Sequence, residues 1–451
     1  MSPATLLLLT LVAAPILILA ALHWRRELLY LLPVLSVLNG LPITVRGSSV
    51  RIDQLVACLL VVPLSASILT GARRLRIDAT TLWLAALLAL NITASALNSP
   101  VPSYSFAQCA NLASAWIIYV VLVNFLETRA EREAFMNRCL WAALIASSIG
   151  IVAFVFAMVG VPIGGAEVSS SAAEEFTKAF GASGTMVEPN VFGSFTASYA
   201  VLSIALLAMM PRSHANAASV RLLRWTAALT ATGLVLSFTR SAWLGAAGGL
   251  AVAWQMGWRV LAIRRRRVLI PLAIGGIAVL VLVLLPGVAG AFIRFKLANL
   301  VNVESRTATL RLFMYSLALQ QSLQHPLIGF GTFTFAPLMA QGSDFARFEG
   351  WRNLWIGNYL VLALHDTGVL GLSSWIGLLW SVISGGLHTA RRFTADAAEM
   401  SGPVIALTAA VICLLIAFLA TSGFSLGYPW LLIGLLGAHG RLTPHQPGAA
   451  T

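Results

Sequence analysis

Residues 225–258 read WTAALTATGLVLSFTRSAWLGAAGGLAVAWQMGW, a stretch in which Arg240 is the single charged residue. Apolar runs lie on both sides of this arginine, at 225–239 and 242–258. A helix that crosses a bilayer needs about 20 predominantly apolar residues. The stretch therefore predicts two membrane helices joined by almost no linker, with Arg240 at the membrane boundary between them.

The composition of the whole chain extends this interpretation. Of its 451 residues, 59% are hydrophobic and 10% are charged, whereas about a quarter of the residues of a soluble globular protein are charged. We expect an all-α fold, a polytopic transmembrane helical bundle of about 12 spans. It forms one membrane domain, 1–441, followed by a disordered tail, 442–451. The other apolar runs lie near 4–22, 27–43, 53–70, 80–97, 107–125, 139–160, 191–210, 268–289, 358–388, 402–421 and 424–439.

The net charge of +13 could indicate a nucleic-acid partner, but the distribution of the arginines argues against one. They cluster in alternate loops, which is the positive-inside pattern of membrane proteins. We therefore assign these loops to the cytoplasm. The loops between them, 44–52, 98–106, 161–190 and 290–357, then face the periplasm of a Gram-negative cell. The clusters contain Arg25, Arg26, Arg73, Arg74, Arg76, Arg129, Arg132, Arg138, Arg212, Arg221, Arg224, Arg259, Arg264 to Arg267, Arg391 and Arg392.

The two long outward loops, 161–190 and 290–357, are expected to form the active face. Within the second, VESRTATLRLFMYSLALQQSLQ at 303–324 has a helical pattern. Its apolar residues Leu310, Phe313, Met314 and Leu317 recur on one face. We expect the helix to end before Pro326, with glycines 329 and 331 in the turn that follows. Because arginines and glutamines interrupt it, the helix cannot span the bilayer and is expected to lie along the interface.

Arginine is the first candidate for site chemistry. An ionisable group at membrane depth is costly and usually faces an internal cavity, although Arg240 could instead snorkel to lipid phosphates. Arg306 and Arg311 belong to the outward loop helix. Guanidinium groups bind phosphate oxygens in a bidentate manner, so these three arginines could form a pyrophosphate clamp. The alternative is that Arg306 and Arg311 only solvate the polar side of the helix.

Candidate general bases lie on the same side of the membrane. Glu188 precedes Pro189 and Asn190 at the start of an apolar run, and His365 and Asp366 lie about two turns into the run that begins at Asn358. Carboxylates and histidine are the usual groups that activate a hydroxyl. A histidine in an apolar helix is, however, more often a hydrogen-bonded packing residue.

The motifs of metal-dependent and nucleotide-driven enzymes are missing. The chain has no Asp-x-Asp pair, no His-Glu-x-x-His and no glycine-rich phosphate loop with lysine. Its four cysteines lack the paired spacing of a zinc site or a disulfide framework. We therefore expect no cofactor and no metal site. Phosphate charge would be neutralised by arginine, and the donor would be an activated phosphate carried by a lipid.

Five short motifs follow one another in a recognisable order. They are G-x-x-x-EPN-x-F at 184–192, S-x-T-R-S at 237–241, R-x-x-x-Y at 311–315, HPL-x-G-x-G at 325–331 and N-x9-G-x-x-G at 358–371. In this set the chain resembles the O-antigen ligase and polymerase superfamily of bacterial envelope glycosyltransferases, over roughly residues 180–375.

The resemblance implies a C-type, metal-independent glycosyltransferase of the bacterial inner membrane. Such enzymes move a saccharide from an undecaprenyl-diphosphate-linked oligosaccharide or polysaccharide donor to a glycan or lipid A–core acceptor, at the periplasmic face. In the family the arginines that match Arg240 and Arg311 hold the diphosphate. We expect Arg240, Arg311, Glu188 and His365 to be catalytic and Arg306, Asn190, Asn358 and Arg352 to bind substrate.

One position departs from the pattern of the ligases. They have a histidine directly before the asparagine of N-x9-G-x-x-G, and here that residue is Gly357. Either His365 or Glu188 takes the role of base, or the acceptor chemistry differs. The departure favours a polymerase of O-antigen or exopolysaccharide repeat units over a ligase that attaches polymer to lipid A–core. A transporter of polysaccharide or lipid-linked saccharide is a second alternative, although no related halves are visible in the sequence.

Overall fold

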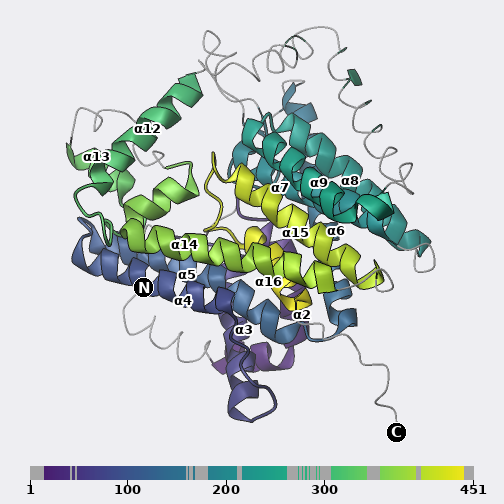
Figure 1. The fold of residues 1–451 in the computed structure, drawn as a ribbon, viewed down its shortest axis with the longest axis horizontal. Coiled ribbons are helices and arrows are strands. Elements are labelled where there is room, and N and C mark those ends of the chain that lie inside the picture. The colour runs from purple at the N-terminus through teal and green to yellow at the C-terminus, as the bar shows by residue number, and fades with distance from the viewer. Residues whose placement is uncertain are drawn as a thin grey trace.

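The computed structural model describes ten segments of the chain and a few separate positions (Figure 1). The segments are 15–40, 43–45, 48–158, 161, 166–167, 181–210, 216–261, 306–342, 356–392 and 398–440, and the separate positions are 273, 277, 280, 281, 284, 291 and 294. Arg352, the predicted span at 268–289, most of the one at 4–22 and the tail 442–451 lie wholly or largely outside this part of the chain.

Helices make up nearly all of the described structure. They are α2 (Arg25–Ser36), α3 (Ile52–Leu69), α4 (Ala79–Leu97), α5 (Pro102–Phe125), α6 (Arg129–Met158), α7 (Pro189–Met209), α8 (Ala217–Leu236), α9 (Arg240–Leu261), α12 (Arg306–Ser322), α13 (Phe335–Gly342), α14 (Tyr359–Arg392), α15 (Ala398–Ala417) and α16 (Gly427–His439). Two short antiparallel hairpins join them, β1 (Ile43–Val45) with β2 (Ser48–Val50) and β3 (Ala166–Glu167) with β4 (Gly181–Ala182).

The helices coincide with the apolar runs of the sequence. Among the described residues, six helices are long and apolar enough to cross a membrane, namely α3, α4, α5, α6, α7 and α14. The protein is therefore an all-α, multi-pass membrane protein. The larger number of about 12 spans remains a prediction from hydropathy.

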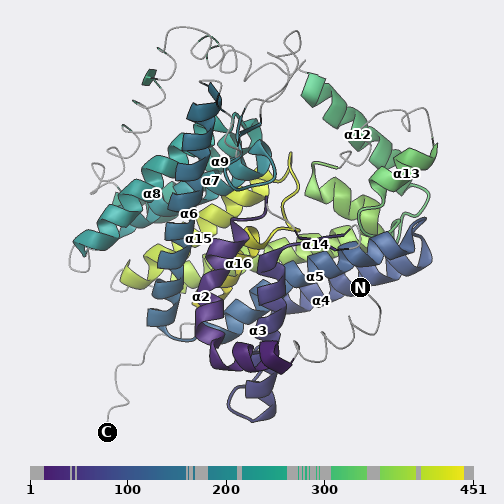
Figure 2. The same cartoon turned by 180° about the vertical axis from the view of Figure 1, so that it is seen from behind.

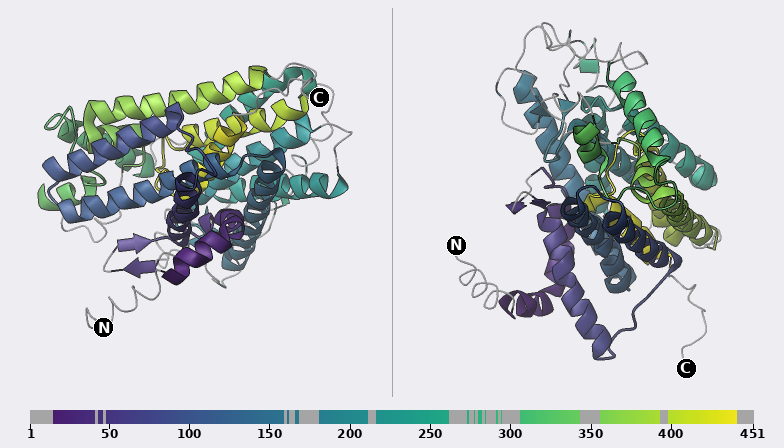
Figure 3. Two further views of the ribbon diagram at one scale, coloured as in Figure 1. Left: turned by 90° about the horizontal axis from the view of Figure 1, so that it is seen from below. Right: turned by 90° about the vertical axis from the view of Figure 1, so that its left-hand side faces the viewer.

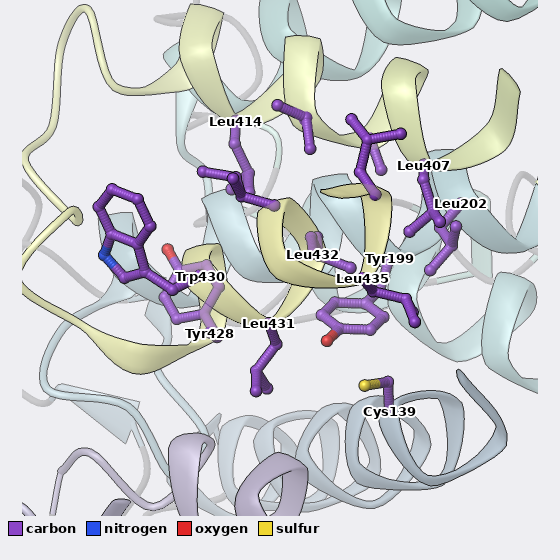
Figure 4. Packing of buried hydrophobic residues seen from close by; sticks show 14 of the residues in the cluster. Cys139, Tyr199, Leu202, Leu407, Leu414, Tyr428, Trp430, Leu431, Leu432 and Leu435 are labelled. Carbon is purple, nitrogen blue, oxygen red and sulfur yellow. The ribbon is translucent and has the colours of Figure 1, made fainter. Parts of the chain in front are cut away.

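The core is built around α7, which lies in the middle of the bundle. Within its apolar window 94% of the residues are buried, and it packs against α8, α9 and α15. Figure 4 shows Tyr199 and Leu202 of α7 beside leucines of α15 and α16 and Cys139 of α6. The hydroxyl groups of Ser194 and Tyr428 lie 2.8 Å apart and join α7 to α16. Packing and hydrogen bonds of this kind hold helices together in lipid.

Glycines bring α9 close to α15. A Cβ atom at Gly245 would lie 2.4 Å from the carbonyl oxygen of Cys413, and one at Gly249 would lie 2.7 Å from that of Ala409. Any larger side chain at these positions would separate the two backbones. Small residues have this role at many interfaces between membrane helices.

Contacts between loops join residues that are distant in the sequence. Asn39 accepts a hydrogen bond from the Val187 amide, and the amide of Asn98 donates to the Gly329 carbonyl. Arg73 and Arg76 lie 3.2 and 3.4 Å from the carboxylate of Glu127. The first two contacts join segments in or next to loops that were predicted to face outward, and the ion pairs join two arginine-rich segments. The membrane face on which each group lies remains a prediction.

Candidate active site

The start of α7 is bonded to the turn between α8 and α9. The hydroxyl of Thr239 donates a hydrogen bond of 3.1 Å to the carbonyl oxygen of Pro189. Glu188 is the N-cap residue of α7, and Arg240 is the first residue of α9. Two candidate residues that are distant in the sequence therefore stand at neighbouring helix starts. Both side chains are half-buried.

Close packing leaves little space between the first turn of α7 and the turn that precedes α9. A Cβ atom at Gly193 would lie 2.6 Å from Ser237 Oγ and 2.7 Å from Thr239 Oγ1. Phe238, within the turn, has a φ of 51°, a left-handed conformation that is strained for a bulky side chain. Its ring packs 6.2 Å from that of Phe154. Packing therefore holds a strained backbone that turns the chain directly into Arg240.

Such a junction is suited to an anion. The free amide groups at a helix start attract negative charge, and here two starts meet beside a guanidinium group. Pro189 supplies no amide hydrogen, but other residues in the first turns of α7 and α9 have amides that lack an acceptor within the helix. Glu188 adds a carboxylate that can accept a proton. The arrangement can hold a charged leaving group next to a base.

A second cationic position lies on α12. Arg311 is half-buried and has no hydrogen-bond or ion-pair partner within the segments that the structure describes. One turn later the buried hydroxyl of Tyr315 also has no partner among those residues. Burial raises the pKa of Tyr315, and the guanidinium of Arg311 partly offsets this. The hydroxyl therefore stays protonated at neutral pH and can donate a hydrogen bond beside the guanidinium.

The segment after α12 is docked into a break in α14. Gly368 has a φ of 63° and interrupts this helix, which separates the amides of Val369 and Leu370 from their helical acceptors, the carbonyls of His365 and Asp366. Segment 326–331 satisfies all four groups. Phe330 and Gly331 donate to the two carbonyls at 3.0 and 2.8 Å, and the two amides donate to the carbonyls of Pro326 and Leu327 at 2.8 and 3.3 Å.

Glycines make this docking possible. A Cβ atom at Gly329 would lie 2.4 Å from the Thr367 nitrogen, and one at Gly368 would lie 2.4 Å from the carbonyl carbon of Leu327. Backbone groups at membrane depth must be satisfied within the protein. The HPL-x-G-x-G and N-x9-G-x-x-G motifs are therefore two halves of one structural unit, which ties the outward loop to α14.

His365 belongs to this unit. Its side chain is fully buried. Its Nδ1 lies 3.0 Å from Asp366 Oδ1 and its Nε2 lies 3.0 Å from Oε1 of Gln321 on α12. The ring of Phe330 stacks on it at 5.4 Å. With both nitrogens occupied, the imidazole connects α12 to α14, and its contacts are with this docked region.

The remaining candidates have different surroundings. Oδ1 of Asn358 accepts hydrogen bonds from the amides of Leu360 and Val361 at 2.9 and 3.2 Å, so this residue caps α14. Asn190 is half-buried in the first turn of α7. Arg306 is the first residue of α12. Gly357, directly before the cap, is buried.

The structure does not bring all the arginines into contact. In Figures 1 and 2, α12 lies apart from the group of α7, α8 and α9, with the connection between α15 and α16 between them. No hydrogen bond or ion pair joins Arg311 to Glu188 or Arg240 within the described part of the chain. Convergence of three arginines into one clamp remains a prediction.

Three residues of this region were not singled out by the sequence. Thr239 lies within the S-x-T-R-S motif, but its partner and that of Gln321 are far along the chain, so no local pattern could reveal these contacts. Tyr315 lies within the R-x-x-x-Y motif, and its spacing of one helical turn from Arg311 was the available signal.

No group of histidine, cysteine, aspartate or glutamate suited to a metal ion occurs among the residues that the structure describes. The four cysteines are free.

Comparison with known proteins agrees with these features. Residues 225–376 match the family described as O-Antigen ligase. No curated protein matches the chain. The matched region contains Arg240, Arg311 and the docked unit around His365. Residues 225–376 are thus an O-antigen ligase region, and this match supports the resemblance of the chain to the O-antigen ligase and polymerase superfamily.

Proposed function

We propose that this protein is a membrane glycosyltransferase of the bacterial inner membrane, with its active face in the periplasm. Its donor is a saccharide linked to undecaprenyl diphosphate and its acceptor is a glycan. The observation that carries the proposal is the bonded junction of α7 with the turn before Arg240, which has Glu188 at its edge. The O-antigen ligase region supports the class of donor.

The reaction is a displacement at the anomeric carbon of the donor sugar. The acceptor hydroxyl attacks this carbon, and the bond to the diphosphate oxygen breaks as the new glycosidic bond forms. Glu188 takes the proton of the hydroxyl. Arg240 and the amides of the two helix starts stabilise the negative charge on the departing diphosphate. These groups can provide the charge compensation that a divalent cation provides in other glycosyltransferases.

Arg311 and Tyr315 are assigned to donor binding. Both groups donate hydrogen bonds, and neither has a partner among the described residues. An oxyanion of the diphosphate or a sugar hydroxyl would satisfy both at once. Arg306, Asn190, Asn358 and Arg352 keep their role as candidate substrate-binding residues.

Glu188 is favoured over His365 as the general base. Its side chain is half-buried at the helix junction, while that of His365 is fully buried and hydrogen-bonded through both nitrogens. A base must reach the proton that it removes. His365 is therefore assigned the role of positioning α12, and with it Arg311.

Polymerisation of repeat units is the favoured activity, because Gly357 replaces the histidine of the ligases. Ligation of polymer to lipid A–core is the alternative, and the description of the matched family favours it. Transport of a lipid-linked saccharide is a second alternative. The broken helix α14 would suit a transporter, but segment 326–331 already occupies the break.

The test combines a deletion strain with reconstitution. Loss of long chains with a single repeat still attached would identify a polymerase, whereas accumulation of lipid-linked polymer would identify a ligase. The purified protein in liposomes should convert lipid-linked repeat units into a ladder of longer products. If the liposomes only move the lipid-linked saccharide across the bilayer and form no product, the glycosyltransferase proposal is wrong.

A further inference from the structure

Helix α12 has a second apolar face, in addition to the one that packs on the protein. Its inner side contains the buried residues Met314, Ala318 and Ser322, and the helix packs against α14. Leu312, Leu319 and Leu323 recur at i, i+7 and i+11 on the other side. Their side chains are 62%, 46% and 78% exposed. A row of this kind on a protein surface requires a partner.

The position of α12 indicates which partner this is. The helix lies at one end of the bundle and is inclined to α7, α8 and α9 (Figure 1), and in the right-hand view of Figure 3 it is on the side that faces the viewer. A helix that is inclined to the spans and packs on α14 can lie along the membrane interface.

The exposed row continues into the surface of a membrane-length helix. Leu327, which follows α12, is 64% exposed, and its carbonyl accepts a hydrogen bond from the amide of Leu370 on α14. Leu370 is 49% exposed, and Ile376 and Trp380 further along α14 are also exposed. Helix α14 is one of the six candidate spans. Exposed apolar residues therefore occur on α12, on the segment that follows it and on the adjoining part of α14.

We propose that the face formed by Leu312, Leu319, Leu323 and Leu327 is inserted into the bilayer leaflet at this end of the protein. The partner is lipid hydrocarbon, because the face is hydrogen-bonded through Leu327 to a candidate membrane span whose neighbouring apolar residues are also exposed. An amphipathic helix in the interface buries one side at the boundary between headgroups and acyl chains.

The proposal has a consequence for the candidate site. At 100° per residue, Arg311 lies on the same side of α12 as the buried Ala318 and Ser322, and Tyr315 lies between that side and the exposed row. An inserted α12 lies at the boundary between headgroups and acyl chains, so if the proposed function holds, Arg311 would meet a lipid-carried diphosphate near the depth of the helix. The insertion itself does not depend on that function.

The test measures the depth of individual positions in the full-length protein. Leu319→Cys and Leu323→Cys, each in a Cys58→Ala background, are labelled with the fluorophore NBD and reconstituted in phosphatidylcholine and phosphatidylglycerol liposomes. Cys58 is the exposed thiol and the other three are buried, so the label is specific. NBD is preferred to tryptophan fluorescence because the chain has 13 tryptophans. The matched control is Gln320→Cys, next to Leu319 and also exposed.

We expect lipids with a spin label on the acyl chain to quench the probes at 319 and 323 several-fold more than the probe at 320. Iodide in the water should show the opposite order. Strong iodide quenching at 319 and 323 would overturn the proposal. So would protection from both quenchers, which would indicate a protein partner. Because no glycan transfer is measured, failure of the proposed function would leave this result unaffected, and the reverse also holds.

Discussion

Thr239 donates a hydrogen bond of 3.1 Å to the carbonyl oxygen of Pro189, and this contact joins the helix that begins after Glu188 to the helix that begins at Arg240. The bond is buried, and it joins two helices instead of belonging to the backbone hydrogen bonds of either one. It fixes the relative position of a candidate base and a candidate phosphate ligand. Its removal should therefore affect catalysis more than folding.

Thr239→Val tests this relationship, because valine keeps the shape of the side chain and loses the donor. We expect the free energy of unfolding to fall by about 1 kcal/mol. The rate of glycan transfer by the reconstituted protein should fall by more than the loss of folded protein explains. Thr230→Val on α8 is the matched control, since the Thr230 hydroxyl bonds within its own helix to the carbonyl of Thr226. Equal transfer by the two variants would show that the junction has no role in catalysis.

Arg240→Ala and Arg240→Lys test the phosphate ligand. Both variants should insert and fold, and both should fail to form polymer, since an ammonium group cannot replace the bidentate guanidinium. Arg224→Ala is the control, because this exposed arginine lies on α8 towards the arginine-rich end. Full activity of Arg240→Lys would mean that only a positive charge is needed there.

Tyr315→Phe tests the second pair of donors, together with Arg311→Ala. A hydrogen bond to a charged group is worth about 1.5–3 kcal/mol, so kcat/KM should fall by about 10- to 100-fold in the phenylalanine variant. Arg311→Ala should abolish polymer formation. Tyr30→Phe on α2 is a control on a residue outside the candidate site. An unchanged kcat/KM in Tyr315→Phe would remove this residue from the site.

The raised pKa of Tyr315 adds a prediction about pH. Burial raises this pKa, so the hydroxyl remains protonated below it and loses its donor only as the pH rises through it. The ratio of wild-type to Tyr315→Phe activity should therefore be constant between about pH 6 and pH 8, well below the ordinary tyrosine pKa. A ratio that falls towards one within this interval would contradict a protonated, donating hydroxyl.

Local patterns in the sequence were sufficient for the helices. The apolar runs on either side of Arg240 became α8 and α9, with the arginine at the start of α9. Helix α12 ends at Ser322, before Pro326, as the motif requires. These features depend on hydrophobic runs, proline and glycine, and each is decided by residues that are close together in the chain.

Contacts across the chain could not be predicted in this way. The apolar stripe expected on α12 included Met314, which is buried, and Leu310 and Phe313, which are largely exposed. Only the packing against α14 determines which side of the helix is covered. Likewise, the pairing of His365 with Gln321 depends on the docking of segment 326–331, for which the sequence contains no periodic signal.

His365→Ala and Glu188→Gln separate the positioning residue from the base. Removal of the imidazole leaves the Gln321 amide and the buried Asp366 carboxylate short of a partner, so His365→Ala should lose at least about 2 kcal/mol of stability. Glu188→Gln should retain the melting temperature of the wild type and lose kcat with little change in KM. If a folded His365→Ala variant lost only kcat, and Glu188→Gln stayed active, the two assignments would have to be exchanged.

Gly368→Ala tests whether the break in α14 is required. At a φ of 63°, alanine is strained, and its Cβ would lie 2.4 Å from the carbonyl carbon of Leu327. Either the break or the docked segment must move, and α12 with Arg311 would move with it. We expect a large loss of folded protein after detergent extraction, measured by size-exclusion chromatography. Gly385→Ala on the same helix is the matched control, because no atom lies within 4 Å of its added Cβ. Alanine there should raise stability by up to about 1 kcal/mol, and an equal outcome for the two variants would mean that the break tolerates a side chain.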